Sequence, residues 1–355
     1  MYQKKEKKKK VRQDGMTPLS DLGEFGLIER LTSDIKIFHP ETLQGVGDDA
    51  AVIDAGDKVI LFSTDLLVEG IHFDMTYMPL RHLGYKAAVV NISDIAAMNG
   101  IPKQITCSIA VSNRFSVEAL EEIYRGFKIA CEKYKVDFVG GDTSSSIKGL
   151  MISVSILGEA LKEEVVYRNG AKPGDLICVT GDLGSAYLGL LILEREKKVF
   201  EVNPGMQPEL AAYDYLLARQ LKPEARTDIR DLLHNLGIKP SSMIDISDGL
   251  ASEILHICKK SGMGCKLYEE KIPMDDNTRH LAMEFKIIPS VAALSGGEDY
   301  ELLFTVPQSA YEKIRDVIGI TIIGYITPPG EGKNMITPDG KVIPLTAQGW
   351  DGMKG

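Results

Sequence analysis

Tryptophan, cysteine and histidine are scarce in this chain, with one, five and six copies among 355 residues. The cysteines form no CxxC pair or other zinc spacing and their number is odd, so neither a zinc site nor a disulfide framework is indicated. We expect reduced, mostly packed thiols. No apolar run is long enough to cross a bilayer and no secretory apolar segment follows the basic start, so we expect a cytoplasmic protein.

The basic residues are unevenly placed. Residues 1–14 carry a net charge of +5, and the rest of the chain carries −14, because the total is −9. We expect 1–22 to be a disordered basic tail, solubilising or non-native, with Met16 as an alternative start. The acidic remainder argues against nucleic-acid binding. A mass of 39.0 kDa with 44% hydrophobic residues predicts two globular domains.

Familiar catalytic and nucleotide-binding motifs are also missing. The sequence has no G-x-x-x-x-G-K-[ST] loop, no H-R-D and D-F-G pairing, and no evident Cys-His or Ser-His-Asp arrangement. The turn "GDLGSAYLG" at 181–189 fits either a phosphate site at a helix N-terminus or a plain packing turn, and we favour the packing turn.

Strand-like and helix-like patterns alternate along the chain, which predicts an α/β (α+β) fold. A first α/β domain is expected over 23–165 and a second over 166–355, with the linker around "YRNGAKPGD" at 167–175. Helices are expected at 23–33, 83–100, 116–134, 184–196, 249–262 and 309–319. Strands are expected at 58–70, 104–112, 150–161, 175–181 and 320–326, and a short strand from 136 runs into Gly140.

Aspartates recur beside Gly, Ser or Thr at strand ends or on the polar face of a helix. Each has an ordinary explanation, such as a turn or a helix cap, and Asp49 beside Asp48 would then simply be solvated. Together such carboxylates repel unless cations neutralise them, and oxygen ligands without His or Cys suit Mg²⁺, which binds substrate phosphates. The set therefore predicts a Mg²⁺-nucleotide site formed by Asp48, Asp49, Asp65, Asp94, Asp142, Asp245 and Asp248.

Seven motifs in fixed order resemble the thiamine-monophosphate kinase family, whose superfamily includes aminoimidazole ribonucleotide synthetase and selenophosphate synthetase. They are "GVGDDAAV", "STDLLVEGIHF", "YKAAVVNISDIAAMNG", "VGGDTS", "YRNGAKPGD", "DISDGL" and "SGGEDYELLF", and the likeness runs from about Gly23 to Trp350. The resemblance implies a homodimer paired through mixed N-terminal sheets. It also implies ATP-dependent phosphorylation of thiamine monophosphate to thiamine diphosphate, with several Mg²⁺ and no covalent intermediate.

The same resemblance implies roles for individual residues. The implied metal ligands are Asp49, Ser63, Thr64, Asp65, Asp94, Asp142, Asp245 and Asp248; the ATP contacts are Tyr124, Gly141, Asp142, Arg168 and Ser247; the substrate contacts are His72, Glu298 and Trp350.

These roles make physical sense. A phosphate monoester has a second pKa near ~6, so the acceptor oxygen is already ionised and no general base is expected. Arg168 fits a fork on a phosphate or a structural salt bridge equally well. Trp350 and Glu298 suit the thiazolium cation, although the alternatives are a hydrophobic plug and an acid-capped turn. His72 fits a half-buried histidine as well as a ligand.

Two other functions remain open. One is a different ATP-dependent synthetase of the superfamily; a selenophosphate synthetase usually carries a reactive Cys or selenocysteine near its N-terminus, whereas no Cys here precedes Cys107. The other is a catalytically silent Mg²⁺-nucleotide-binding regulator, against which the acid set is intact.

Overall fold

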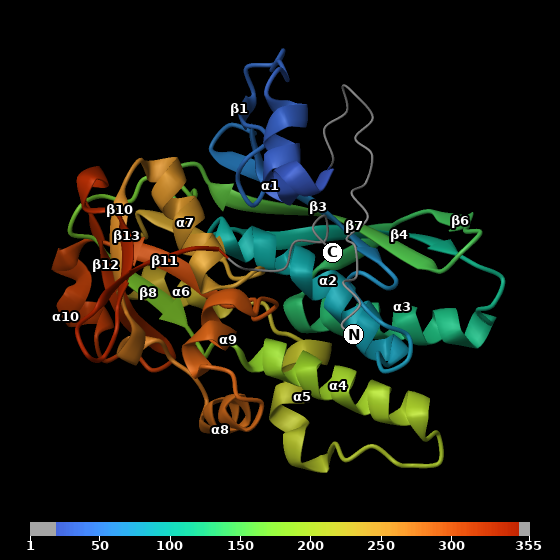
Figure 1. The fold of residues 1–355 in the computed structure, drawn as a ribbon. Helices are drawn as coiled ribbons and strands as arrows, with labels where there is room; N and C mark the ends of the chain where they lie inside the picture. Colours follow the sequence, from blue (N-terminus) through green and yellow to red (C-terminus); the bar gives the residue numbers. More distant parts are fainter. Residues whose placement is uncertain (1–18, 348–355) are drawn as a thin grey trace, which may run out of the picture. The chain divides into compact units, whose positions relative to one another are not determined.

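The computed structural model describes residues 19–347, and Figure 1 shows their elements. Of these, residues 19–36 and residues 37–347 belong to two compact units, each described by itself. In the first unit, helix α1 (Leu19–Thr32) is interrupted at Gly23, which has φ 66° and ψ 179°. Among residues 19–347, no helix has the length and apolar character needed to cross a membrane.

The second unit contains two seven-stranded sheets. The first sheet is mixed, as expected, because β5 and β6 run parallel to β4 whereas the other neighbours are antiparallel. Its strand order is β1 (Thr42–Gln44), β2 (Ala51–Asp54), β3 (Lys58–Val68), β7 (Leu150–Leu161), β4 (Ile101–Val111) and β5 (Asp137–Gly140), with β6 (Thr143–Ser145) also paired to β4.

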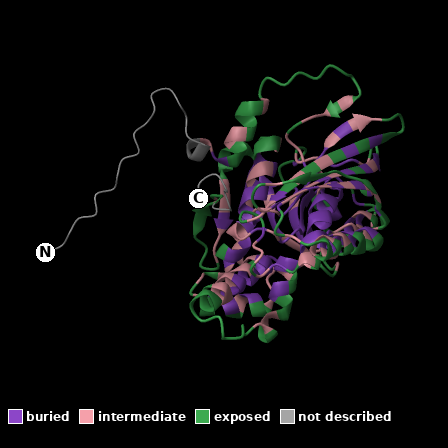
Figure 2. Cartoon of the chain, turned by 90° about the vertical axis from the view of Figure 1, so that its right-hand side faces the viewer, coloured by how far each residue is buried: buried purple, intermediate pink, exposed green. Residues whose placement is uncertain are grey.

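Strand β3 shows why this sheet has two different faces. Side chains alternate along a strand, so Val59, Leu61 and Leu67 are buried on one face. Ile60 and Phe62 point the other way and are exposed. Only one face of the first sheet is therefore fully covered by helices of the described chain, as the purple core and green outer strands of Figure 2 indicate.

Helices α2 (Leu80–Ala97) and α3 (Val117–Tyr134) cover the buried face and cross closely. A Cβ on Gly84 of α2 would lie 1.8 Å from the carbonyl oxygen of Ile123, and one on Gly126 of α3 would lie 1.7 Å from that of Arg81. The two glycines therefore let each backbone rest directly on the other helix.

The second sheet has buried residues on both faces, so its strands read as nearly continuous apolar runs. Helices α7 (Leu250–Ser261) and α9 (Pro289–Ser295) contribute to one core, and α6 (Asp228–Asn235) and α10 (Tyr311–Ile314) to the other. Its strand order is β14 (Val342–Pro344), β13 (Lys333–Ile336), β10 (Gly264–Tyr268), β12 (Ile320–Thr327), β8 (Leu176–Thr180), β11 (Leu302–Val306) and β9 (Ser242–Asp245).

Two helical segments differ from the sequence-based expectation. The helix expected at 309–319 is limited to α10 after a 3-10 turn, because Val317 and Ile320 close three-residue turns instead of continuing the helix. Residues 204–240, for which no helix is predicted, contain α6 and α5 (Asp214–Leu221). The remaining helices are α4 (Ser185–Val202) and α8 (Asp276–Glu284). All five cysteines are buried and free, as expected.

Candidate functional site

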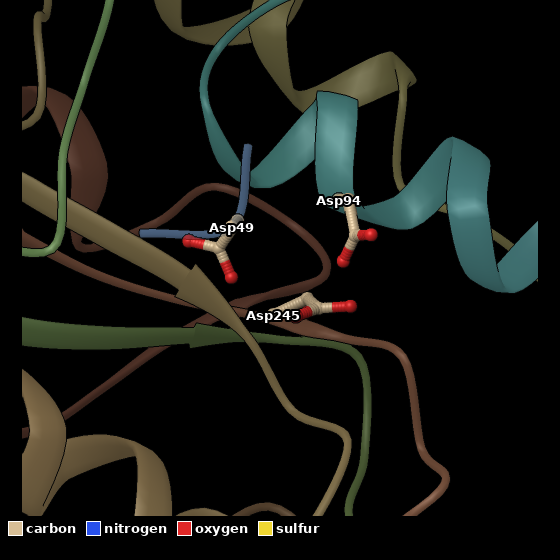
Figure 3. Close-up of side chains that lie close together, drawn as sticks. All are labelled: Asp49, Asp94 and Asp245. Carbon is tan, nitrogen blue, oxygen red and sulfur yellow. The ribbon is translucent and has the colours of Figure 1, made fainter. Parts of the chain in front are cut away.

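Three aspartates that are distant in the sequence converge in the second unit (Figure 3). Asp49 lies in the turn before β2, Asp94 near the end of α2, and Asp245 at the end of β9. One carboxylate oxygen from each lies within 4.8 Å of the other two. Asp49 and Asp245 are buried and Asp94 is partly buried.

The convergence follows from how α2 meets the two sheets. Ser93 of α2 donates a 2.6 Å hydrogen bond to Asp245 of β9, and Ser63 of β3 donates a 2.5 Å hydrogen bond to Asp94. The helix thus connects the buried face of the first sheet with the end of an edge strand of the second.

Arg168 holds the adjacent pair of aspartates. Its Nη2 and Nε lie 2.7 and 3.1 Å from the two oxygens of Asp49, and its backbone N–H donates to Asp48 at 3.1 Å. Asp49 is therefore not simply solvated, since it has a cationic partner within the chain. Of the two interpretations of Arg168, the salt bridge is the one present in the structure.

Several carboxyl groups in and around the cluster have raised pKa values. Burial, and then the charge of Asp49, raise the pKa of Asp245 to about 7. Burial raises the pKa of Asp65 to about 6. The pKa of Asp94 is raised well above its usual value by burial and then by Asp65, Asp245 and Asp49. The cluster favours protonation or a bound cation.

This donor set fits Mg²⁺. The cluster of Asp49, Asp94 and Asp245 presents carboxylate oxygens, and the neighbouring polar groups are the hydroxyls of Ser63 and Ser93. Hard oxygen ligands of this type suit Mg²⁺, whereas Zn²⁺ sites usually contain His or Cys.

The "STD" segment divides between the two faces of β3. Ser63 and Asp65 lie on the same face as the buried Leu61 and Leu67, toward α2. Thr64 lies on the opposite face, where its hydroxyl donates to the carbonyl of Val154 at 2.9 Å. The structure therefore brings Ser63 and Asp65 toward the cluster but not the side chain of Thr64.

Tyr124, Gly141 and Asp142 form a separate group where α3 meets β5 and β6. The rings of Tyr124 and Phe138 lie 5.9 Å apart, and a Cβ on Gly141 would lie 1.8 Å from the carbonyl oxygen of Cys107. Asp142 is exposed and outside the three-aspartate cluster. A surface hollow of about 640 Å³ lies beside this group and is lined by Val117, Leu120, Glu121, Tyr124, Arg125 and Lys128.

Asp248 and Ser247 follow Asp245 in the turn before α7. The N-cap of this helix is Gly249. Glu253, in the first turn, accepts the backbone N–H of Asp248 at 3.1 Å. Glu253 is buried, and burial followed by the charge of Asp248 raises its pKa well above the usual value. Glu253 is not among the site residues predicted from the sequence, although an acid in the first helical turn is a known capping signal.

The loop 296–301 packs against this turn in an unusual backbone conformation. Glu298 and Tyr300 have φ of 60° and 52°, a region that costs non-glycine residues energy. Their backbone N–H groups donate to Ser247 and Ile246 at 2.7 and 2.9 Å. Tyr300 is buried; burial, followed by the charges of Glu298 and Asp65, raises its pKa. The charges of Glu298 and Asp65 thus both act on the buried Tyr300.

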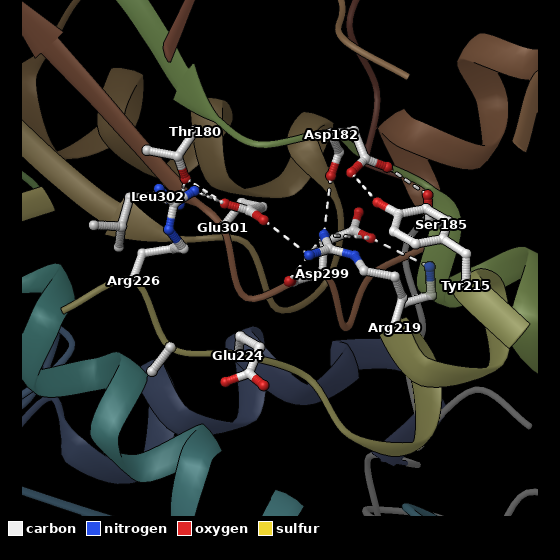
Figure 4. Close-up of polar contacts among 12 residues, drawn as sticks. Thr180, Asp182, Ser185, Tyr215, Arg219, Glu224, Arg226, Asp299, Glu301 and Leu302 are labelled. Carbon is white, nitrogen blue, oxygen red and sulfur yellow. Dashed lines mark hydrogen bonds and ion pairs between the residues drawn. The ribbon is translucent and has the colours of Figure 1, made fainter. Parts of the chain in front are cut away.

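A buried polar network fixes the far end of this loop (Figure 4). Glu301 accepts hydrogen bonds from Arg219 at 2.9 Å, Arg226 at 2.7 Å and Thr180 at 2.5 Å.

The neighbouring Asp299 settles the role of the turn at 181–189. Its carboxylate accepts the backbone N–H groups of Gly184 and Ala186 at 2.7 and 3.4 Å. The N-terminus of α4 is therefore capped by a carboxylate of the chain itself, which agrees with a packing turn.

His72 follows β3 and is exposed. The backbone N–H of Val68 donates to its Nδ1 at 2.9 Å, so Nδ1 carries no proton and Nε2–H is the remaining donor of the neutral ring. Trp350 lies outside the described residues.

Comparison with known proteins places these features in a family. Residues 47–160 match the model of the AIR synthase related protein, N-terminal domain. The thiamine-monophosphate kinase of Aquifex aeolicus (strain VF5) is 36% identical over 334 residues, which cover 94% of this chain and 98% of that protein. That of Bacillus subtilis (strain 168) is 34% identical, with 94% and 100% covered. The chain belongs to the thiamine-monophosphate kinase family.

Structural comparison agrees with membership of the thiamine-monophosphate kinase family. A solved structure described as "AaThiL complexed with AMPPCP and TMP" has a TM-score of 0.81 and 33% identity, and the match covers 95% of this chain and 99% of that one. The residues matched by the N-terminal domain model include Asp49 and Asp94, whereas Asp245 lies beyond them. The three-aspartate cluster is therefore completed by the second half of the chain.

Proposed function

We propose that this protein transfers the γ-phosphoryl group of ATP to the phosphate of thiamine monophosphate, giving thiamine diphosphate and ADP. Its relatives are named thiamine-monophosphate kinases, and the similar solved structure contains TMP and AMPPCP, a non-hydrolysable ATP analogue. The observation that carries the proposal is the convergence of Asp49, Asp94 and Asp245, because donor and acceptor phosphates are both anionic and require cations between them.

Asp49, Asp94 and Asp245 are the residues that would hold Mg²⁺, with Asp65 and Ser63 adjacent. Asp142 and Asp248, which are also implied ligands, lie outside the three-aspartate cluster. The side chain of Thr64 lies on the opposite face of β3, so only its main chain is on the side of the cluster. Bound Mg²⁺ supplies charge neutralisation and orientation of the phosphate oxygens. The acids bind the ion in their deprotonated form, in which they otherwise repel one another. Bound Mg²⁺ removes this repulsion and would therefore stabilise the folded chain.

No side chain is needed as a general base, because the acceptor phosphate is largely ionised at neutral pH, with a second pKa near ~6. The chain's task is to align the two phosphates and to exclude water. The buried positions of Asp49 and Asp245 suit that task, since electrostatic interactions strengthen away from solvent.

The proposed nucleotide contacts fall into two groups. Tyr124, Gly141 and Asp142 lie together beside the hollow at α3, whereas Arg168 and Ser247 lie near the aspartates. Arg168 uses Nε and Nη2 for Asp49. Its remaining guanidinium N–H groups are the donors available to a phosphate, so the salt bridge and the ATP contact are compatible.

The proposed acceptor contacts are His72, Glu298 and Trp350. His72 is an exposed ring after β3, and its Nδ1 accepts the backbone N–H of Val68. The side chain of Glu298 is 29% exposed, so a ligand can reach it.

We also infer a homodimer formed through the outer face of the first sheet. Ile60, Phe62 and Leu66 of β3 and Leu157 of β7 are exposed there, at 38%, 41%, 53% and 39%. Exposed apolar side chains on one face of a sheet, here interrupted by Thr64, are typical of an interface. We also propose that one domain ends at 165 and the next begins at 166. The linker 167–175 lies between the last strand of the first sheet and the first strand of the second.

The test is to incubate the purified full chain with Mg²⁺-ATP and thiamine monophosphate and to separate the products by chromatography. Formation of thiamine diphosphate and ADP in equal amounts is expected. Asp245→Asn should abolish it, and Asp316→Asn, at an exposed position in α10's following turn, is the matched control. Absence of thiamine diphosphate from a preparation that binds nucleotide would favour another ATP-dependent synthetase or a regulator.

A further inference from the structure

Lys86 is a fully buried lysine on the helix that carries Asp94. It is 1% exposed and lies eight residues before that aspartate on α2. Its Nζ forms an ion pair with Oε1 of Glu298 at 2.9 Å and donates to the carbonyl of Gln220 at 3.1 Å. An ammonium group in such a place needs a charged partner, because burial without one is strongly unfavourable.

Gln220 of α5 holds the other side of the same carboxylate. Its Nε2 donates to Oε2 of Glu298. Both oxygens of Glu298 are therefore bound, one by α2 and one by α5, while 29% of the side chain remains exposed. The preceding residue on α5, Arg219, binds Glu301 of the same loop.

The backbone at Glu298 also requires support. Its φ of 60° is unfavourable for a residue with a side chain, and such conformations persist only where the surroundings determine them. The ion pair with Lys86, the hydrogen bond from Gln220 and the backbone hydrogen bond to Ser247 provide that determination.

We propose that Lys86 and Gln220 are positioning residues of the acceptor site, which orient the carboxylate of Glu298 toward the bound thiamine monophosphate. The inference rests on the proposed function, in which Glu298 contacts the acceptor. Because Lys86 neutralises Glu298, this carboxylate acts as an oriented hydrogen-bond acceptor and not as a free counter-charge for the thiazolium ring. Neither residue belongs to the three-aspartate cluster, so we expect their effect on acceptor binding.

The experiment compares Lys86→Met with the wild-type chain by calorimetric titration of thiamine monophosphate without ATP and by steady-state kinetics. We expect at least a tenfold weaker affinity and a similar rise in KM for thiamine monophosphate, with KM for ATP changed less than twofold. Lys266→Met, which removes an ion pair with Glu331 at the second sheet, is the matched control and should change neither constant.

Gln220→Met keeps both buried charges and serves if Lys86→Met fails to fold; it should shift the same constants in the same direction by a smaller factor. A melting-temperature cycle of Lys86→Met, Glu298→Gln and the double variant adds a readout independent of activity, and the double variant should melt above Glu298→Gln because it leaves no unpaired ammonium group.

Equal changes in both KM values, or unchanged affinity in Lys86→Met and Gln220→Met, would overturn the positioning role. Failure of the proposed function is distinguishable, because then the wild-type chain itself forms no thiamine diphosphate.

Discussion

The guanidinium group of Arg168 binds both oxygens of the Asp49 carboxylate, through Nη2 at 2.7 Å and Nε at 3.1 Å. Among the described residues, the side chain of Asp245 accepts a hydrogen bond from Ser93, and Arg168 acts on it only through its charge. The aspartates of the cluster are therefore unequal: Asp49 is paired directly with a guanidinium group, whereas Asp245 is not, and burial raises its pKa to about 7.

This inequality predicts opposite effects of two substitutions on stability. Asp49→Asn removes the carboxylate that accepts two hydrogen bonds from Arg168, leaving only the more distant Asp48 as a charged partner, and should lower the free energy of unfolding by roughly 2–4 kcal/mol. Asp245→Asn removes a repelling charge and should leave the metal-free protein equally stable or more stable. Both should reduce turnover by at least about 100-fold. Denaturant unfolding and product chromatography measure the two effects; equal losses of stability would contradict the difference, and Asp316→Asn is the control.

The raised pKa values predict how Mg²⁺ stabilisation depends on pH. The pKa of Asp245 rises from 3.8 to about 7, and that of Asp65 to about 6. The folded state therefore binds more protons than the unfolded state between 3.8 and about 7, so these groups make the metal-free protein less stable as the pH rises through that range. Above it the acids are charged and bind cations best.

The increase in melting temperature on adding Mg²⁺ should thus be larger at about pH 8 than at about pH 5.5, where protons compete with the ion. Thermal unfolding with and without Mg²⁺ at each pH measures it. In Asp245→Asn the increase should be smaller at the higher pH. An increase that is the same at both pH values would argue against metal binding by these acids.

Arg219 is predicted to be essential for the stability of the loop 296–301. Its side chain is 13% exposed and pairs with Glu301, which is 3% exposed. Arg219→Met leaves a buried carboxylate with fewer donors and should cost about 3–5 kcal/mol of unfolding free energy. Arg315→Met, at a pair exposed by 45% and 84%, should cost less than about 1 kcal/mol. Similar losses in both variants would show that the network is not stabilising.

The crossing of α2 and α3 predicts a strong effect from a single methyl group. In Gly84→Ala the added Cβ would lie 1.8 Å from a carbonyl oxygen, so the helices must separate. We expect a loss of at least about 1–3 kcal/mol, measured by denaturant unfolding. Gly330→Ala is the matched control, because a Cβ there meets nothing within 4 Å. A stability of Gly84→Ala equal to that of the control would refute the close crossing.

Much of the fold is predictable from periodicity. The apolar repeats locate α2, α3, α4, α7 and the long strands, because those segments have ten or more residues in one pattern or lie between clear turns. Periodicity missed α5 and α6, which have eight residues each and are stabilised by packing rather than by their own pattern. Periodicity also predicted a helix that extends beyond α10, because apolar residues such as Val317 and Ile320 fit a helix as well as the turns that the structure contains there.

The candidate site divides in the same way. Motif order identified Asp49, Asp94 and Asp245, although no local pattern reveals that they meet. The period of two in β3 could have separated Thr64 from its neighbours, since its side chain must lie on the other face. The sequence distinguishes Lys86 only as a lysine within an apolar helix. The left-handed backbone of Tyr300 is not predictable from the sequence, because glycine is the residue that usually indicates this conformation. The assigned roles remain predictions.

The two glycines at the crossing of α2 and α3 have a consequence for motion during a reaction. Backbones in direct contact cannot slide or rotate past one another without a clash, so α2 behaves as a fixed strut. Lys86 and Asp94 are eight residues apart on it, about 12 Å along the axis, and they keep that spacing. We therefore expect α2 to keep its position against α3 during the reaction. Any closure around substrates would come from the turns that surround this helix.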